Sequence, residues 1–150
     1  MLDAASARRS YPGDDFVLPF GVAKRVREGG DISIITWGAM VERCEAGADK
    51  AGVAADIIDL RTLAPWDRVA ALASVRRTHR CLIVHEDIMT AGFGAEIAAV
   101  VADEAFIDLD APIARLAMPD IPSPHHPALM EWALPSADDI AKKIADLVRF

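Results

Sequence analysis

The sequence predicts an α/β fold in which a largely parallel sheet is covered by helices on both faces. Short β-branched apolar runs alternate along the chain with segments whose apolar residues recur at helical spacing. That alternation is typical of parallel strands joined by crossover helices. The apolar runs are also nearly continuous, which indicates strands that are buried on both faces.

The first strands and the first helix are placed by their turn and cap residues. Residues 24–28 are predicted to form a short edge strand, and the β-branched run 32–37 a buried strand. After Gly38, a helix is expected to about Ala51, with small residues on its inner face that let it lie close to the sheet. Gly52 is the expected C-cap of this helix because glycine tolerates the left-handed conformation found there.

The middle of the chain repeats the pattern. Residues 53–60 are predicted to form a second buried strand, and Asp67 is a suitable N-cap for the helix that follows. Residues 81–85 form a third, nearly all-apolar strand. Beginning at Phe93, apolar residues recur at i, i+4, i+7 and i+8, which predicts an amphipathic helix.

The last third of the chain is less regular. Residues 112–117 are a fourth buried strand candidate, and the proline-rich stretch 118–135 is predicted to be irregular. Within this stretch His125 and His126 are expected in a solvated or subunit-contact loop. Ser136, with an aspartate three positions later, resembles a capping box that starts the last helix.

Composition narrows the possible functions. A chain of 150 residues suits one domain. Its formal net charge of −7 argues against binding to nucleic acid. No apolar run approaches the roughly 20 residues that a membrane-spanning helix needs, so no membrane contact is expected.

The cysteines and one arginine cluster have simple interpretations. Cys44 and Cys81 do not have the spacing of a metal or redox pair, and we expect two small buried residues in a reducing, cytoplasmic or otherwise intracellular, compartment. Arg76, Arg77 and Arg80 are expected to be a solvated helix end, where cations are favourable.

The loop after the third strand is where the residues themselves would place a site. It begins with His85, Glu86 and Asp87, and ligands of open α/β sheets bind beyond the carboxyl ends of strands. A histidine beside two carboxylates suits acid–base chemistry or a metal ion. The alternative is a hydrogen-bonded cluster in a loop or an interface, and the residues alone leave both open.

A pair of glycines opens the helix that follows this loop. The sequence Gly92-Phe93-Gly94 at a helix start suggests phosphate binding. However, the G-x-G-x-x-G pattern is incomplete because residue 97 is isoleucine. A tight turn that lets the helix pack closely is the favoured interpretation. A stand-alone module that binds a phosphate ligand remains the alternative.

Five segments in the same order resemble the C-terminal domain of the transketolase family. The most specific is D-I-I-D-L-R-T-L-A-P-W-D, residues 56–67, whose D-L-R-T-x-x-P-x-D string is similar to beta subunits of 2-oxoacid dehydrogenases. The segments that carry the resemblance are residues 31–41, 56–67, 84–97, 109–115 and 119–124.

The resemblance implies a three-layer α/β/α domain with a five-stranded, mostly parallel sheet and one antiparallel strand. Residues 1–20 would be a linker or lead-in and residues 21–150 the domain. It also implies a parent enzyme that decarboxylates a 2-oxoacid on thiamine diphosphate and magnesium and passes the acyl group to a lipoyl group. The branched-chain type is preferred, with pyruvate and acetoin types, transketolase and 1-deoxyxylulose-5-phosphate synthase as alternatives. This domain alone is expected to be inactive, with no catalytic, cofactor-binding or metal-binding residue.

The expected role is assembly. The resemblance implies contacts with the alpha subunit and with a second beta subunit, including a homodimer contact. It also implies docking of the basic peripheral subunit-binding domain of the dihydrolipoamide acyltransferase. If Phe150 is the native end, its carboxylate lies beside an apolar ring and Arg149. The residues predicted to contact partners are His85, Glu86, Asp87, Phe93, Glu96, Arg149 and Phe150.

Overall fold

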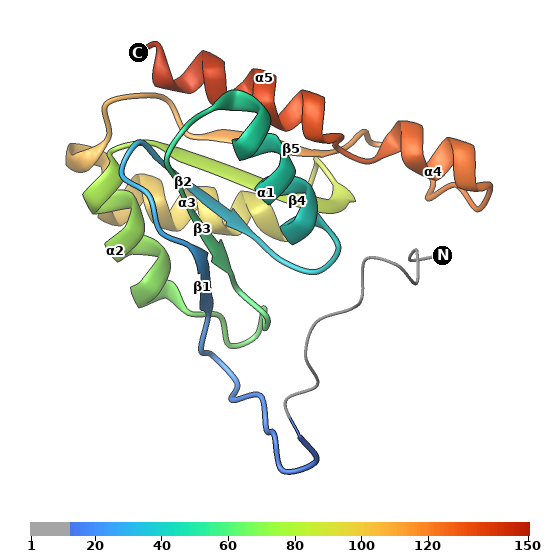
Figure 1. Ribbon diagram of the computed structural model, residues 1–150, viewed down its shortest axis with the longest axis horizontal. Helices are drawn as coiled ribbons and strands as arrows, with labels where there is room; N and C mark the ends of the chain where they lie inside the picture. The colour runs from blue at the N-terminus through green and yellow to red at the C-terminus, as the bar shows by residue number, and fades with distance from the viewer. Residues whose placement is uncertain (1–12) are drawn as a thin grey trace.

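The computed structural model describes residues 13–150 and shows a five-stranded sheet between two layers of helices (Figure 1). The strand order is β1-β3-β2-β4-β5. All neighbours are parallel except β1, which runs antiparallel to β3 at the edge. The predicted fold class is confirmed. The part of the predicted lead-in that covers residues 1–12 lies outside the described residues. The strands are β1 (Lys24–Arg27), β2 (Ile32–Thr36), β3 (Ala55–Asp59), β4 (Cys81–Ile88) and β5 (Ala114–Met118).

Two helices cover each face of the sheet, and a fifth lies to one side. Helices α1 (Met40–Ala51) and α5 (Ala137–Val148) pack on one face, and α2 (Arg68–Thr78) and α3 (Phe93–Glu104) on the other. The short helix α4 (Pro127–Ala133) projects beyond the end of the sheet (Figure 1). In the described part of the chain, no helix is long and apolar enough to cross a bilayer.

The caps expected from the sequence are present. Gly52 adopts the left-handed conformation at the end of α1, and the Asp67 carboxylate accepts the Ala70 N–H at the start of α2. Ser136 and Asp139 form both bonds of a capping box. Hydrogen bonds from the Ser136 hydroxyl and backbone hold the pKa of the Asp139 carboxyl below its usual value.

Apart from shifts of one or two residues at element ends, two features differ from the prediction. Strand β4 continues to Ile88 because β5 pairs alongside it as far as Met118. The stretch 118–135, predicted to be irregular, contains α4. Its first helical residue is Pro127, whose fixed φ suits that position, and the His126 ring accepts the Ala128 N–H. That cap was not expected from the sequence, since histidine is not a common N-cap residue.

The two cysteines behave as buried apolar residues. Cys44, on the inner face of α1, lies in one core cluster, and Cys81 lies in the core on the other face of the sheet. Burial raises the pKa of each thiol to about 12, so the reactive thiolate is strongly disfavoured. Because the sheet separates the two residues, they cannot form a disulfide with each other.

The arginine cluster is bonded to the body of the domain and is not simply solvated. Arg76 donates to the Glu104 carbonyl, and Arg80 donates from Nε to the Leu147 carbonyl at the end of α5. Arg77 pairs with the carboxylate of Asp56. Arg76 and Arg77 are exposed in the last turn of α2, as predicted, but their acceptors come from segments distant in the sequence and were not foreseen.

Asp56, on β3, is a buried carboxylate held by three side chains from two other elements. Its side chain is fully buried. Arg77 and the Ser74 hydroxyl, both from α2, donate to Oδ2. Arg25 of β1 forms an ion pair with Oδ1, with Nε at 3.3 Å. Because a buried charge is costly unless it is paired and hydrogen-bonded, this carboxylate favours one position for the edge strand and for α2.

We expect Asp56→Ala to lower the free energy of unfolding by about 2–3 kcal/mol. That is less than for a fully buried pair, because both guanidinium groups can regain water once the acceptor is lost. Urea unfolding measures the change. Asp49→Ala is the matched control because Asp49 forms an exposed ion pair with Arg27 and should cost less than about 1 kcal/mol. Equal losses in the two variants would contradict this account of Asp56.

Candidate functional site

His85 is a packing residue at the carboxyl end of β4. Its ring is fully buried and stacks on Trp37, with 5.3 Å between ring centroids and 5° between planes. The backbone of α3 closes against the ring edge. A Cβ at Gly92 would lie 2.8 Å from His85 Cε1, and one at Gly94 only 2.4 Å from Nε2. Both glycines are therefore required for helix and imidazole to occupy this space.

This packing disfavours a charged imidazole. Burial lowers the pKa of His85, and the positive charge of Arg115 lowers it further. The Asp87 carboxylate and backbone raise it and only partly compensate. Neither ring nitrogen has a partner at hydrogen-bonding geometry. His85 thus acts as a flat, neutral group between the indole and the helix.

The glycine pair lets the start of α3 pack directly on the imidazole. A Cβ on either residue would overlap the His85 ring. The favoured interpretation, a turn that permits close packing, agrees with this geometry. Within residues 13–150, no group of three or more metal-ligating side chains is gathered.

The neighbours of His85 have different surroundings. Glu86, Asp87 and Glu96 are exposed, whereas Phe93 is half-buried. The Phe93 ring packs edge-on against Trp37 and Trp66 at centroid distances of 6.0 and 6.2 Å. Because the His85 side chain is not accessible to solvent, it can contribute to an interface only by positioning the residues that follow it.

The loop beyond β4 is fixed by a contact that the sequence analysis missed. The N–H and hydroxyl of Thr90 both donate to the Asp120 carboxylate, at 2.8 and 2.5 Å. These bonds hold the pKa of the Asp120 carboxyl below its usual value. No local pattern links two residues 30 positions apart, so only the tertiary structure reveals this contact.

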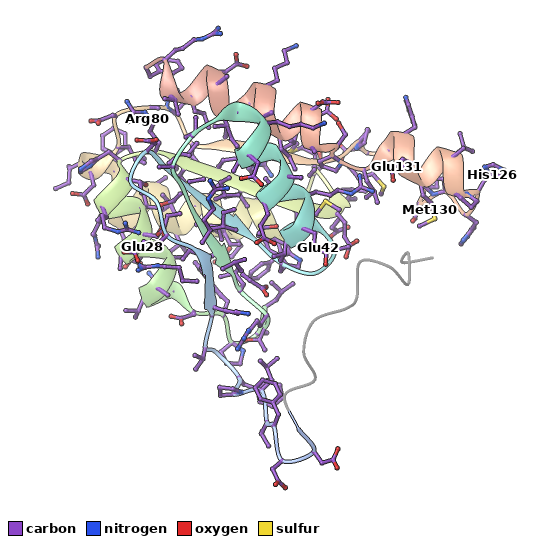
Figure 2. The ribbon with its side chains drawn as sticks, viewed as in Figure 1. Glu28, Glu42, Arg80, His126, Met130 and Glu131 are labelled. Atoms are coloured by element: carbon purple, nitrogen blue, oxygen red, sulfur yellow. The ribbon has the colours of Figure 1, made fainter. Side chains whose placement is uncertain are left out.

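Arg149 and Phe150 lie at the opposite end of the sheet from Glu86. Both are exposed, with Phe150 71% accessible. Their helix is tied through Leu147 to Arg80, which immediately precedes β4, whereas Glu86 lies near the end of that strand. Figure 2 shows the same separation, with Arg80 far from Met130 and Glu131. The predicted contact residues therefore form two separate groups.

At the amino end of the sheet, apolar side chains are also exposed near the C-terminal residues Arg149 and Phe150. Phe106 and Ile107, in a 3-10 turn after α3, are 71% and 92% accessible. The turn is linked to His79, whose ring bonds to the Asp108 carbonyl at 2.7 Å. Since His79 adjoins Arg80, which bonds to α5, this end presents apolar groups from two segments. The sequence analysis did not single out Phe106 or Ile107.

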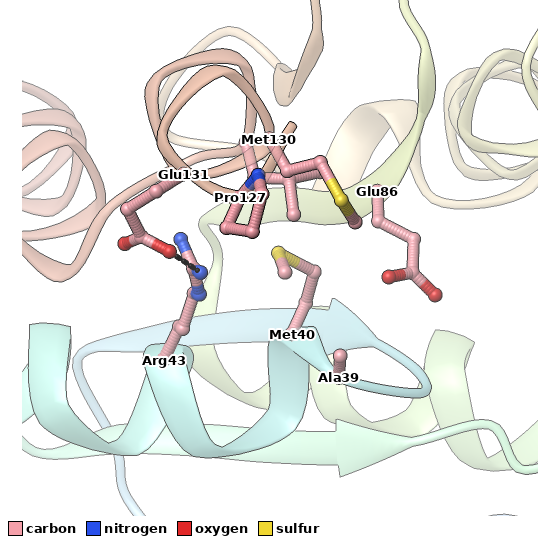
Figure 3. A pocket seen from close by; sticks show the side chains of 8 residues that line it. Ala39, Met40, Arg43, Glu86, Pro127, Met130 and Glu131 are labelled. Carbon is pink, nitrogen blue, oxygen red and sulfur yellow. Dashed lines mark hydrogen bonds and ion pairs between the residues drawn. The ribbon is translucent and has the colours of Figure 1, made fainter. Parts of the chain in front are cut away.

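At the carboxyl end, a pocket of about 410 Å³ separates α1 from α4 (Figure 3). Arg43 of α1 spans one side of it, donating to Glu131 Oε2 at 2.6 Å and to the Pro135 carbonyl at 3.0 Å. These two bonds hold α4 against the body of the domain. The lining residues are Ala39, Met40, Arg43, Glu86, Pro127, Met130, Glu131 and Leu134.

Comparison with known proteins identifies the family. A model described as "Transketolase, C-terminal domain" matches residues 21–140. The chain belongs to the transketolase C-terminal domain family. A solved structure described as a split gene transketolase, inactive beta4 tetramer, has the same fold with a TM-score of 0.75, at 24% identity over 91% of this chain and 44% of that one.

Curated relatives of this transketolase C-terminal domain are dehydrogenase beta subunits. The 2-oxoisovalerate dehydrogenase subunit beta 2 of Arabidopsis thaliana is 43% identical over 79% of the chain and 34% of that protein. The 2-oxoisovalerate dehydrogenase subunit beta of Bacillus subtilis is 38% identical over 93% of the chain and 44% of that protein. The Bacillus subtilis pyruvate dehydrogenase E1 component subunit beta is 37% identical over 97% of the chain and 45% of that protein. The chain thus spans less than half the length of these relatives.

We expect Gly94→Ala to destabilise this transketolase C-terminal domain by about 1–3 kcal/mol, because the new methyl group overlaps the His85 ring. The loss should occur even though alanine favours helix formation. Chemical denaturation measures it, and the near-ultraviolet signal of Trp37 should change with the stacking geometry.

Gly30→Ala is the control, since a Cβ there meets nothing within 4 Å. Its effect should stay within about 1 kcal/mol. The double variant His85→Ala/Gly94→Ala should lose less stability than the sum of the single variants, because the overlap is gone. Additive losses would show that the histidine does not require the glycine.

Proposed function

We propose that this domain is the assembly domain of the beta part of a thiamine diphosphate-dependent 2-oxoacid dehydrogenase. The observation that carries the proposal is the 37–43% identity to dehydrogenase beta subunits over 79–97% of the chain. The parent enzyme would oxidatively decarboxylate a 2-oxoacid and transfer the acyl group to lipoyl. The two buried free thiols suit a reducing cytoplasmic or other intracellular location.

For the substrate we propose a branched-chain 2-oxoacid. Pyruvate is the second candidate because the pyruvate relative from Bacillus subtilis, at 37% identity, is nearly as similar as the 2-oxoisovalerate relative at 38%. Neither candidate is favoured by a residue of this domain. Relative turnover of the two 2-oxoacids by the assembled parent enzyme would distinguish them.

The two ends of the sheet would contact different partners. At the carboxyl end, the exposed Glu86, Asp87 and Glu96 would face the alpha subunit or a second beta subunit. At the amino end, Arg149 and Phe150 would dock the peripheral subunit-binding domain of the dihydrolipoamide acyltransferase. Exposed aromatic side chains are common anchors in interfaces, and the net charge of −7 complements a basic partner.

We expect the 150-residue chain to bind a basic peripheral subunit-binding domain in a salt-dependent manner. Raising the salt from about 50 to about 500 mM should weaken binding because the exposed charges are screened. Phe150→Ala should weaken it about tenfold, as loss of an aromatic anchor does. Surface plasmon resonance measures both effects.

Phe20→Ala is the control for docking. Phe20 is an equally exposed phenylalanine, 81% accessible, in the segment that leads into β1. Its loss should leave the dissociation constant unchanged. Binding that is indifferent to salt and to Phe150 would remove the support for docking at this end.

We further propose that thiamine diphosphate and magnesium bind to parts of the parent enzyme outside this domain. The support is the imidazole that fills the space above Gly92 and Gly94. Titration calorimetry of this chain with thiamine diphosphate and magnesium should give no saturable heat, whereas the full parent enzyme should bind both. Saturable binding to the isolated chain would overturn the proposal.

A further inference from the structure

We propose that the pocket between α1 and α4 binds an arginine side chain of a companion polypeptide. The aliphatic stem of the arginine would lie along the methionines, and its guanidinium group would pair with Glu86. This site is at the other end of the sheet from Phe150, so it does not depend on acyltransferase docking.

The walls of the pocket suit an aliphatic chain. Met40 is fully buried and forms the floor, while Met130, half-buried on α4, faces it (Figure 3). Pro127 and Leu134 complete the apolar lining. Methionine side chains are flexible and polarizable, so they adapt to an inserted group. A long basic side chain can bury its methylene groups on such a surface while its charged end stays near water.

The charges around the pocket leave one carboxylate without a partner. Arg43 is occupied by Glu131 and by the Pro135 carbonyl. The Glu86 carboxylate is exposed, and within the described residues it has no hydrogen bond or ion pair. It lies on the other side of the two methionines from the Arg43–Glu131 pair (Figure 3). The site therefore carries one uncompensated negative charge, which a single cation would balance.

Arginine suits this site better than a compact ammonium ion. A guanidinium group is weakly hydrated and planar, and it can bind a carboxylate through two parallel hydrogen bonds. The Glu86 carboxylate is held above the start of α1, with Oε1 3.2 Å from the position of a Cβ on Gly38. The absence of a side chain at Gly38 leaves room for the carboxylate next to the pocket.

The surroundings favour a polypeptide as the source of the arginine. Helix α4 also exposes Leu129 and Trp132, which are 54% and 71% accessible, so apolar residues flanking the arginine would find contacts. A second copy of this chain fits less well. A two-fold axis passing through this site would bring Glu86 and Asp87 close to their own copies, and like charges repel.

The probe is the peptide acetyl-Leu-Arg-Leu-amide, compared with its citrulline analogue, which has nearly the same shape but no charge. The readout is the proton–carbon methyl spectrum of the methionines in the 150-residue chain. We expect the arginine peptide to shift the Met40 and Met130 signals saturably. Met89 and Met118 serve as internal references. The citrulline peptide should bind about three- to fivefold more weakly, as expected for an exposed ion pair.

Two variants test whether the Glu86 carboxylate causes the difference in binding between the two peptides. Glu86→Gln should remove the difference between the peptides, whereas Asp87→Asn, which neutralises the neighbouring exposed carboxylate, should preserve it. Circular dichroism checks that both variants are folded. The proposal fails if the peptides bind equally to the unaltered chain, or if neither shifts Met130. It also fails if the Met130 signal moves with protein concentration alone, since the occupant would then be a second copy.

Discussion

The buried charge of Asp56 is the constraint on which much of this domain depends. Strand β1 is antiparallel and lies at the edge, so its backbone pairs with β3 alone. The carboxylate adds an ion pair from Arg25 to that pairing, and bonds from Ser74 and Arg77 attach α2 to the same point. Unlike apolar contacts, these bonds are directional, and they favour one arrangement of strand and helix over others of similar burial.

The network continues into the next strand. The Ser33 hydroxyl of β2 contacts the hydroxyls of Ser74 and Thr78 at 2.5 and 2.7 Å. Three hydroxyl groups, all buried, thus link the central strand to the helix that covers it. Buried polar groups that were left unpaired would destabilise this face, so the network acts as a unit.

At the carboxyl end of the sheet, a residue type that is common in active sites serves as a packing group. His85 would be a natural acid–base group if it were solvated, but it is enclosed by Trp37, Gly92 and Gly94. The groups that stay exposed are Glu86 with the pocket beside it at one end and Phe150 at the other. These are the groups through which we propose that the domain contacts other polypeptides.

The sequence by itself determined the elements whose causes are local. Gly52, Asp67 and Ser136 set helix ends through their own backbone preferences or nearest neighbours, and the apolar runs marked the strands. The tertiary structure alone decided the contacts between distant segments. Examples are Arg77 with Asp56 and Thr90 with Asp120. The reason is that spacing fixes the period and caps of an element, whereas side-chain pairing depends on which elements the fold brings together.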